Sequence, residues 1–264
     1  MRRRCDSQDL RRLRRGARVL RIGHRGAAAL EPENTLAAFR RAVELDVDFV
    51  EFDVLDLADG TLVLAHSDDL LEVSHGVAAG RVRPLRLPEL REVAPELPTL
   101  EEALEFFGST AVGLHADVKC GGHGRELAAE LRRHGLVERT VASSFWTRAL
   151  HDLRAEEPRL AVGITYPEDR RGLARRRLLA PLVQPAVGLL GRALPRRLPR
   201  WLKGTGASVA MLHYAVLSQA AVDRCHAREA AVWTWTVNEP ELLRRVVALG
   251  VDGVISDDPR LFLQ

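Results

Sequence analysis

The 264-residue sequence lacks several features that would assign it to particular classes of protein. No uninterrupted apolar stretch reaches the ~20 residues that span a bilayer, and the N-terminus lacks the apolar run of a secretory signal. Aromatic residues make up only 5% of the chain, which is few for a surface that stacks against nucleic acid. We therefore expect a cytoplasmic protein, peripheral at most to the inner face of the membrane, that binds no nucleic acid.

Cysteine is also scarce, since the chain has only Cys5, Cys120 and Cys225. An odd number of cysteines does not suit a disulfide framework, and their spacing matches no zinc-binding pattern. We expect three reduced thiols, which agrees with a cytoplasmic protein.

Lysine is nearly absent, so almost all of the positive charge is carried by arginine, and this charge is unevenly distributed. Residues 1–21 carry a net charge of +7 and residues 166–206 carry +8. Subtracting both from the total of +3 leaves −12 for the rest of the chain. An acidic body is suited to a bound cation, whereas basic segments are suited to an anionic surface.

Short apolar strands alternate with amphipathic helices along most of the chain, which is typical of parallel βα units. The predicted strands are Val19–Gly23, Phe49–Leu57, Val112–Val118, Thr140–Ser144, Leu160–Thr165, Ser208–Leu212, Val232–Thr236 and Gly253–Ser256. The predicted helices are Asn34–Val47, one that begins after an N-cap at Thr99, Arg125–His134, Arg148–Glu156, Leu217–Glu229 and Pro240–Leu249. Eight such units in one domain of about 250 residues predict the α/β class and a single TIM-type (β/α)₈ barrel.

Two segments depart from this alternation near the second strand. The turn signal Asp59-Gly60 is followed by Thr61–Ala65, which we interpret as the return arm of a hairpin at the barrel rim. Such a hairpin would bring His66 back to the level of Asp53. Residues 67–98 contain four prolines and are predicted to be irregular.

The third departure is residues 166–206, which are too long for an ordinary loop between a strand and a helix. Four prolines interrupt clusters of Leu and Val flanked by runs of arginine, so we predict a basic amphipathic insertion, helical in parts. Two interpretations stay open, contact with an anionic membrane or a solvated lid. We accordingly divide the chain into a basic N-terminal arm (1–18) and a barrel (19–264) that contains the insertion.

Polar side chains follow the predicted strands at the end where TIM barrels carry their functional groups. Glu51 and Asp53 are two residues apart, and so are Asp117 and Lys119, so each pair points to one side of its strand. Three carboxylates that converge at a barrel mouth need neutralisation by a hard divalent cation, such as Mg²⁺ or Ca²⁺.

The first strand ends in His24 and Arg25, and His66 follows the rim hairpin. Two histidines beside a cation are suited to general acid and general base catalysis near neutral pH. Arg25 and Lys119 can hold an anionic substrate. Together these groups indicate phosphoryl chemistry.

The motifs that contain these residues resemble the glycerophosphodiester phosphodiesterase family. They are His24-Arg25-Gly26, Pro32-Glu33-Asn34-Thr35, Glu51-Phe52-Asp53-Val54, Asp59-Gly60, His66, Ser143-Ser144-Phe145, Trp235-Thr236-Val237-Asn238, Gly250-Val251-Asp252-Gly253 and Asp257. The resemblance extends over residues 19–264 apart from the insertion, and it implies the same TIM barrel.

The resemblance also implies roles for individual residues. Glu51 and Asp53 would bind the metal, His24 and His66 would act as the acid–base pair, and Arg25 would lie near the phosphate. Members of the family hydrolyse a glycerophosphodiester to glycerol phosphate and an alcohol. In a proposed route, a glycerol hydroxyl attacks phosphorus and water opens the resulting cyclic phosphate, so one histidine activates the hydroxyl and the other protonates the leaving alcohol.

The chain departs from the family pattern at three places. Asp117 stands where the family usually has the glutamate of an E-x-K motif, and Ser67 stands where it usually has aspartate. Residues Leu70–Ser74 replace a Leu-x-Arg-Thr-Thr run. An aspartate as the third metal ligand also resembles sphingomyelinase D-like enzymes, which we keep as an alternative.

Further alternatives concern function and two individual residues. A lysophospholipid is a second candidate substrate, and a non-catalytic lipid-binding barrel is a rival class, although four intact motif residues, His24, His66, Glu51 and Asp53, argue against it. Glu33 either binds metal or substrate, or orients Arg25. Trp235 either lines the substrate pocket or belongs to the core.

Overall fold

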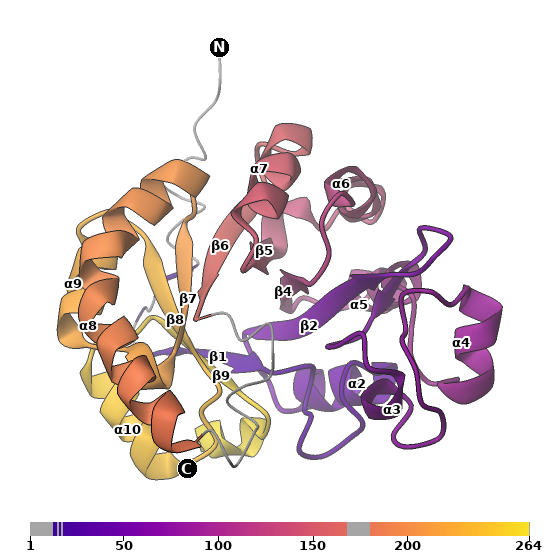
Figure 1. The fold of residues 1–264 in the computed structure, drawn as a ribbon, viewed down its shortest axis with the longest axis horizontal. Helices are drawn as coiled ribbons and strands as arrows, with labels where there is room; N and C mark the ends of the chain where they lie inside the picture. The colour runs from indigo at the N-terminus through magenta and orange to yellow at the C-terminus, as the bar shows by residue number, and fades with distance from the viewer. Residues whose placement is uncertain (1–12, 15, 17, 168–179, 264) are drawn as a thin grey trace.

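The computed structural model describes residues 13, 14, 16, 18–167 and 180–263, with the backbone alone for 180–186. Within these residues, parallel strands form a closed ring, because the first strand pairs with both the second and the last (Figure 1). The strands of the ring are β1 (Leu20–Gly23), β2 (Phe49–Asp56), β4 (Gly113–Val118), β5 (Thr140–Ser144), β6 (Ala161–Tyr166), β7 (Val209–His213), β8 (Ala231–Trp235) and β9 (Gly253–Ser256). The predicted (β/α)₈ barrel is confirmed.

The remaining strand, β3 (Leu62–Leu64), is the predicted hairpin arm at the rim. It pairs antiparallel with the end of β2, so that Leu64 lies opposite Val54 and Leu62 opposite Asp56. Gly60 adopts a φ of 82° in the connecting turn, a conformation that glycine adopts without steric cost. The hairpin returns the chain to the barrel mouth immediately before His66.

The ring is surrounded by helices that connect successive strands, as Figure 1 shows. They are α2 (Leu36–Glu44), α3 (Leu70–Val73), α4 (Leu87–Val93), α5 (Leu100–Gly108), α6 (Gly124–Arg133), α7 (Thr147–Glu156), α8 (Ala180–Thr205), α9 (Gln219–His226) and α10 (Pro240–Ala248), with short 3₁₀ helices at Val137–Arg139, Tyr214–Val216 and Pro259–Leu263. Helix α2 is shorter than predicted, since Asn34 and Asp46 on either side of it have positive φ values of 58° and 55°. Thr35 caps its first turn.

The segment predicted to be irregular, 67–98, contains two short helices instead, α3 and α4. Pro88 does not prevent α4, because it lies in the first turn, where its missing N–H has no helical partner to lose. Leu70 and Leu90 from these helices are buried together with Val63 of the hairpin. The proline pattern therefore marked the start of a helix as well as loops.

The predicted insertion is largely a regular part of the barrel, because α8 is the crossover helix between β6 and β7. Leu194, Leu198 and Leu202 recur every four residues on one face and are buried against the barrel. The predicted helical character is confirmed for residues 180–205, where one helix runs through all four of the prolines. Residues 168–179 of the predicted insertion lie outside the described residues.

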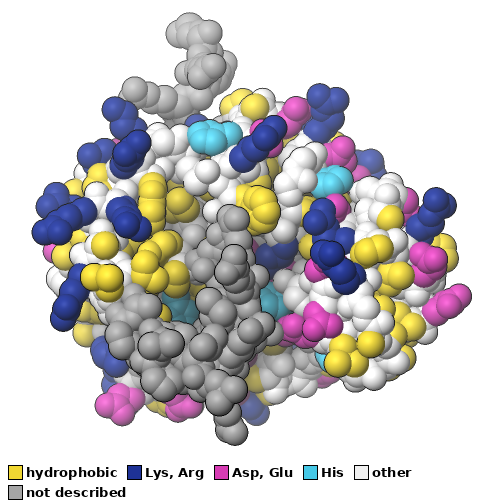
Figure 2. Space-filling view, viewed as in Figure 1, with side chains coloured by type: hydrophobic (Ala, Val, Ile, Leu, Met, Phe, Trp, Pro, Cys, Tyr) yellow, Lys and Arg dark blue, Asp and Glu magenta, His cyan; other side chains and the backbone are white. Residues whose placement is uncertain are grey.

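The opposite face of α8 is basic. Arg192, Arg196 and Arg200 are exposed there. Figure 2 shows Lys and Arg side chains along the edge of the molecule where α8 and α9 lie. None of the helices within the described ranges is long and apolar enough to cross a membrane.

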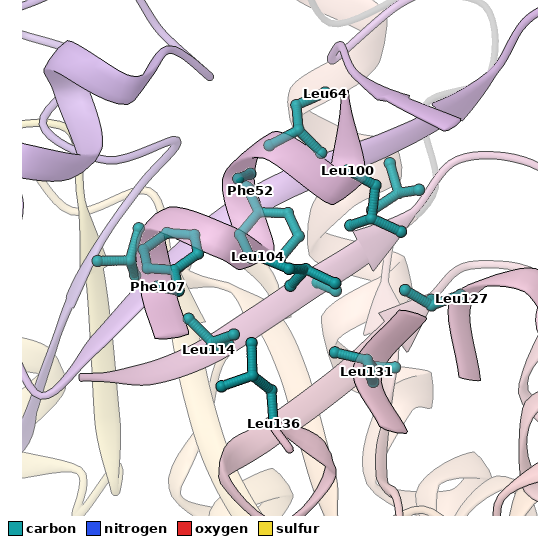
Figure 3. Packing of buried hydrophobic residues seen from close by; sticks show 14 of the residues in the cluster. Phe52, Leu64, Leu100, Leu104, Phe107, Leu114, Leu127, Leu131 and Leu136 are labelled. Carbon is teal, nitrogen blue, oxygen red and sulfur yellow. The ribbon is translucent and has the colours of Figure 1, made fainter. Parts of the chain in front are cut away.

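One part of the hydrophobic core lies between the barrel and its helices. Phe52 of β2 and Leu114 of β4 face outward and pack against Leu100, Leu104 and Phe107 of α5 (Figure 3). The rings of Phe52 and Phe107 are stacked with centroids 5.7 Å apart. The outward positions of these strands are therefore apolar, and their alternate positions point into the barrel.

The interior of the barrel is filled by apolar side chains at the N-terminal ends of the strands. The rings of Phe49 and Trp233 lie with centroids 4.8 Å apart. Gly113 and Gly253 make room for them, because a Cβ at either position would lie within 2.7 Å of one of these rings. The Trp233 indole also donates a 2.9 Å hydrogen bond to the carbonyl of Leu13, which is 1% exposed. Leu13 of the predicted N-terminal arm therefore contacts the interior of the barrel, while the boundary of the arm at residue 18 stays a prediction.

Candidate active site

Three carboxylates converge at the C-terminal ends of two neighbouring strands, as the motif spacing predicts. Glu51 and Asp53 point inward from β2, and Asp53 lies opposite Asp117 of β4 in the parallel register. One oxygen from each of the three lies within 4.8 Å of the others, and all three residues are buried. The closed barrel therefore concentrates negative charge at its mouth.

Two basic side chains lie among these carboxylates. Lys119 contacts Asp117 and places Nζ 2.9 Å from Asp53 Oδ1, and Arg25 places Nε 3.1 Å from Asp53 Oδ2. Burial would raise the pKa of Asp53, but Lys119 and Arg25 outweigh it and hold that pKa well below its usual value. Burial likewise opposes the charge of Lys119, whereas Asp117 and Asp53 raise its pKa above the ordinary value.

The negative charge of Glu51 is less well compensated than that of Asp53. The backbone amide of Arg25 donates a 2.7 Å hydrogen bond to Glu51 Oε2, which favours the ionised carboxylate. Nevertheless, burial and the nearby charge of Asp53 raise the pKa of Glu51 well above its ordinary value. One further positive charge at this position would allow the whole cluster to ionise.

The donor set fits a hard divalent cation. Mg²⁺ and Ca²⁺ prefer carboxylate oxygens, and two oxygens on opposite sides of an ion at about 2.4 Å lie about 4.8 Å apart. The oxygens of Glu51, Asp53 and Asp117 are within this limit. The same three side chains therefore satisfy both the chemistry and the spacing that such an ion requires.

His24 lies directly beside this cluster. Its Nε2 is 3.9 Å from Glu51 Oε2, and its Nδ1 is 2.5 Å from Asp257 Oδ1. Asn238 in turn donates a 2.6 Å hydrogen bond to the other oxygen of Asp257. Burial and the charge of Arg25 lower the pKa of His24, against the opposing effect of Asp257. A neutral His24 ring is thereby favoured near neutral pH.

His66 reaches the site from the rim hairpin. Its Nδ1 lies 3.3 Å from Glu72 Oε1, and 21% of its side chain is exposed, compared with 14% for His24. A ring nitrogen of His66 lies within 4.8 Å of an oxygen of Glu33, which is paired with Arg25 of the charged cluster. The hairpin and the first strand thus bring both predicted histidines to the barrel mouth.

The loop after β1 supplies two supports for these groups. Glu33 accepts a 2.6 Å hydrogen bond from Arg25 Nη1, which corresponds to the orienting interpretation of Glu33. Asn34, which sequence reasoning did not single out, donates to Asp53 Oδ2 and accepts from the Asp53 amide, both at 3.0 Å. The Pro32–Thr35 motif was the signal that could have identified it.

Asp117 has supports that sequence reasoning also missed. Ser143 of β5 donates a 2.6 Å hydrogen bond to Asp117 Oδ1 and lies 2.8 Å from His115 Nε2. Since the serine has one hydroxyl proton and gives it to Asp117, it can only accept from His115. His115 is therefore the Nε2–H tautomer, and burial lowers its pKa to about 4.

Trp235 lies at the mouth as part of an aromatic wall. Its ring centroid is 4.9 Å from that of His213 and 6.3 Å from that of Phe145. Within the described part of the chain, its buried Nε1 has no hydrogen-bond partner. Lys119 Nζ lies 5.6 Å from the centroid of Phe145, so this wall adjoins the charged cluster.

These features define a class of enzyme. Buried carboxylates that suit a divalent cation, two histidines with carboxylate partners and a pair of cationic side chains form a site for hydrolysis of phosphate esters. Because all of them lie at the mouth of a TIM barrel, the site agrees with the usual position of catalysis in this fold.

Comparison with known proteins identifies the family. The sequence model of the glycerophosphoryl diester phosphodiesterase family matches residues 24–261, and the chain belongs to this family. The predicted family and enzyme class are thereby confirmed. The chain is 28% identical to the glycerophosphodiester phosphodiesterase of Caldanaerobacter subterraneus over 93% of this chain and 97% of that protein. It is 27% identical to the probable glycerophosphodiester phosphodiesterase 2 of Mycobacterium tuberculosis, with 93% and 89% covered.

Solved structures give the same result. A putative glycerophosphoryl diester phosphodiesterase from Silicibacter pomeroyi superposes with a TM-score of 0.76 at 26% identity, with 97% of each chain covered. A phosphodiesterase from Oleispira antarctica, solved in complex with the product sn-glycerol-3-phosphate, has a TM-score of 0.71 at 25% identity, with 91% of this chain and 94% of that chain covered.

Proposed function

We propose that this protein hydrolyses glycerophosphodiesters to glycerol phosphate and an alcohol, in a reaction that depends on Mg²⁺ or Ca²⁺. The observation that carries the proposal is the convergence of Glu51, Asp53 and Asp117 within 4.8 Å, directly beside His24. The Oleispira antarctica phosphodiesterase, which binds sn-glycerol-3-phosphate as its product, supports the same substrate class.

The proposed reaction assigns a task to each part of the site. Glu51, Asp53 and Asp117 would hold the cation, which supplies positive charge next to the phosphoryl oxygens when it is bound. Arg25 and Lys119 would bind the phosphodiester anion, with Glu33 as the group that orients Arg25.

The two histidines would move the protons. One takes the proton of the glycerol hydroxyl that attacks phosphorus, and the other donates a proton to the leaving alcohol. Their Nδ1 atoms face Asp257 and Glu72, so their Nε2 atoms are the ones available for these transfers. Trp235 would form one wall of the pocket.

Lysophospholipids extend this proposal, because they carry a glycerophosphodiester attached to an acyl chain. Access to them would require contact with a membrane, and the exposed arginines of α8 could provide it for an anionic surface. Leu189, which is 68% exposed on the same helix, would be an apolar contact. Since Leu194, Leu198 and Leu202 are buried, α8 would approach lipid mainly through its charge.

Hydrolysis measurements test the proposal. Purified protein is incubated with glycerophosphocholine or lysophosphatidylcholine, with Mg²⁺, Ca²⁺ or EDTA, and the release of choline and glycerol phosphate is followed. We expect turnover that requires the metal and is lost in His24→Ala, while a substitution of the exposed Leu71 leaves it unchanged. Release of ceramide phosphate from sphingomyelin without turnover of either glycerol substrate would favour the sphingomyelinase D-like alternative. The absence of any turnover from folded protein would favour a lipid-binding barrel.

A further inference from the structure

Glu72 holds the ring of His66 from outside the barrel. Its Oε1 lies 3.3 Å from His66 Nδ1, and its Oε2 accepts a 3.0 Å hydrogen bond from the Ser67 hydroxyl. The Ser67 hydroxyl accepts in turn from the Asp69 amide at 3.2 Å. Both carboxylate oxygens of Glu72 are therefore engaged, which restricts the side chain to one orientation.

The other predicted catalytic histidine has the same arrangement. His24 Nδ1 faces Asp257, whose second oxygen is held by Asn238, just as His66 Nδ1 faces Glu72, whose second oxygen is held by Ser67. A carboxylate at Nδ1 favours the tautomer with the proton on that atom and directs Nε2 away from it. The two rings are thus oriented in the same way, one by a partner 233 residues away and the other by a partner six residues away.

The geometry also raises a rival interpretation. One ligand atom from each of Glu33, His66 and Glu72 lies within 4.8 Å of the others, a spacing that could accept a second metal ion. However, Glu33 is already paired with Arg25 at 2.6 Å, and Glu72 with Ser67 and His66. These contacts account for the positions of the carboxylates without an ion.

We infer that Glu72 is the positioning residue for His66, with Ser67 as the group that holds Glu72 in place. The inference rests on the proposed function, in which His66 transfers a proton, and it assigns this task to a glutamate at a place where the sequence departs from the family pattern. Because the glutamate acts through the histidine, its removal matters only while the histidine is present.

A double-mutant cycle tests this dependence. Glu72→Ala, Glu72→Gln and Ser67→Ala are measured on glycerophosphocholine in the wild-type and His66→Ala backgrounds. In the wild-type background we expect Glu72→Ala to lower kcat on the order of 10- to 100-fold with KM nearly unchanged. Glu72→Gln should lose less, because its amide oxygen still accepts from Nδ1–H. In His66→Ala, Glu72→Ala should have no further effect.

Two further measurements keep the test independent of folding and of the proposed function. Leu71→Ala, a neighbouring exposed position on α3, should behave as wild type. Ring-nitrogen NMR, with His66 assigned from the spectrum of His66→Ala, should show a protonated Nδ1 in the wild type and a mixture of tautomers in Glu72→Ala. If the wild type hydrolyses no glycerophosphodiester, the proposed function fails, whereas this spectrum still tests the orientation of His66.

Three outcomes would overturn the inference. Glu72→Ala could retain wild-type kcat, or it could lose activity by the same factor in both backgrounds, which would indicate a general structural role. It could also remove one equivalent of bound Mg²⁺ or Ca²⁺ in calorimetry, which would make Glu72 a metal ligand.

Discussion

The two ends of the barrel interior are built from the same strands, but one end is apolar and the other contains the charged cluster. On β2, Phe49 and Asp53 point inward on the same side, four residues apart. On β8, Trp233 fills the N-terminal end, whereas Trp235 lies two residues further along at the mouth. Two to four residues along a strand therefore separate the apolar end of the interior from the charged site.

The difference between the two ends concerns what their residues contribute. At the N-terminal end, large rings fit into spaces left by Gly113 and Gly253, so close packing stabilises the fold. At the mouth, the raised pKa of Glu51, which follows from its burial and from Asp53, means that the carboxylates oppose one another. We interpret the apolar end as the stabilising end and the mouth as the functional end, where charge is retained at a cost in stability.

The largest effect on folding is expected for Trp233→Ala at the N-terminal end. The substitution removes a fully buried indole and the hydrogen bond to the Leu13 carbonyl, so the free energy of unfolding should fall by about 3–5 kcal/mol. Urea denaturation measures this loss. Trp233→Phe is the matched control and should lose less, and an equal loss in both variants would show that packing is not the cause.

Asp53→Asn at the mouth should lower activity strongly and stability only slightly. Turnover should fall on the order of 10²- to 10³-fold, since a proposed metal ligand that also contacts Arg25 and Lys119 is lost. The free energy of unfolding should change much less than in Trp233→Ala, because Lys119 and Arg25 keep Asp117 and Glu33 as partners. A hydrolysis assay measures the turnover, and thermal denaturation with and without Ca²⁺ measures the stability and the effect of the metal. The increase in Tm on addition of metal should disappear in the variant, and a large loss of stability without metal would contradict the division between the two ends.

His115 lies between the two ends and should make stability depend on pH. Burial lowers its folded-state pKa to about 4, below the unfolded value near 6.5, so the unfolded chain binds more protons between these values. The contribution is fully present above pH 6.5 and is lost as the pH falls to about 4, and it amounts to about 3 kcal/mol. Urea denaturation at several pH values measures it. His115→Asn should flatten the dependence in part, because His24, whose pKa burial also lowers, contributes in the same direction.

The outer face of α8 should show neither kind of loss. Replacing Arg192, Arg196 and Arg200 by Glu should change the free energy of unfolding by no more than about 0.5 kcal/mol, since these positions are exposed. Binding to phosphatidylserine vesicles should weaken by about 1 kcal/mol for each arginine. Sedimentation with these vesicles, with phosphatidylcholine vesicles as control, measures the change. Equal binding of the wild type and the variant to phosphatidylserine vesicles would contradict the proposed contact of α8 with the membrane.

Much of the fold could be predicted because it follows from local patterns. The strands of the barrel and the rim hairpin were readable from apolar runs and the Asp59-Gly60 turn signal. Where the prediction was wrong, tertiary packing decided the outcome. Residues 166–206 were predicted to be an insertion that is helical in parts, but residues 180–205 form the crossover helix between β6 and β7, and buried leucines hold this helix against the barrel.

The sequence by itself determined the barrel and the residues of the motifs, because strand periodicity assigns Glu51, Asp53 and Asp117 to inward positions whatever their partners are. Only the tertiary structure decided which groups support them. The contact of Ser143 with Asp117 joins two strands, and that of Asp257 with His24 joins the loops after two strands. The contact of Glu72 with His66 depends on a short helix that was not predicted. The physical reason is that a hydrogen bond depends on distances of a few tenths of an ångström, which are set when the ring of strands closes and not by spacing along the chain.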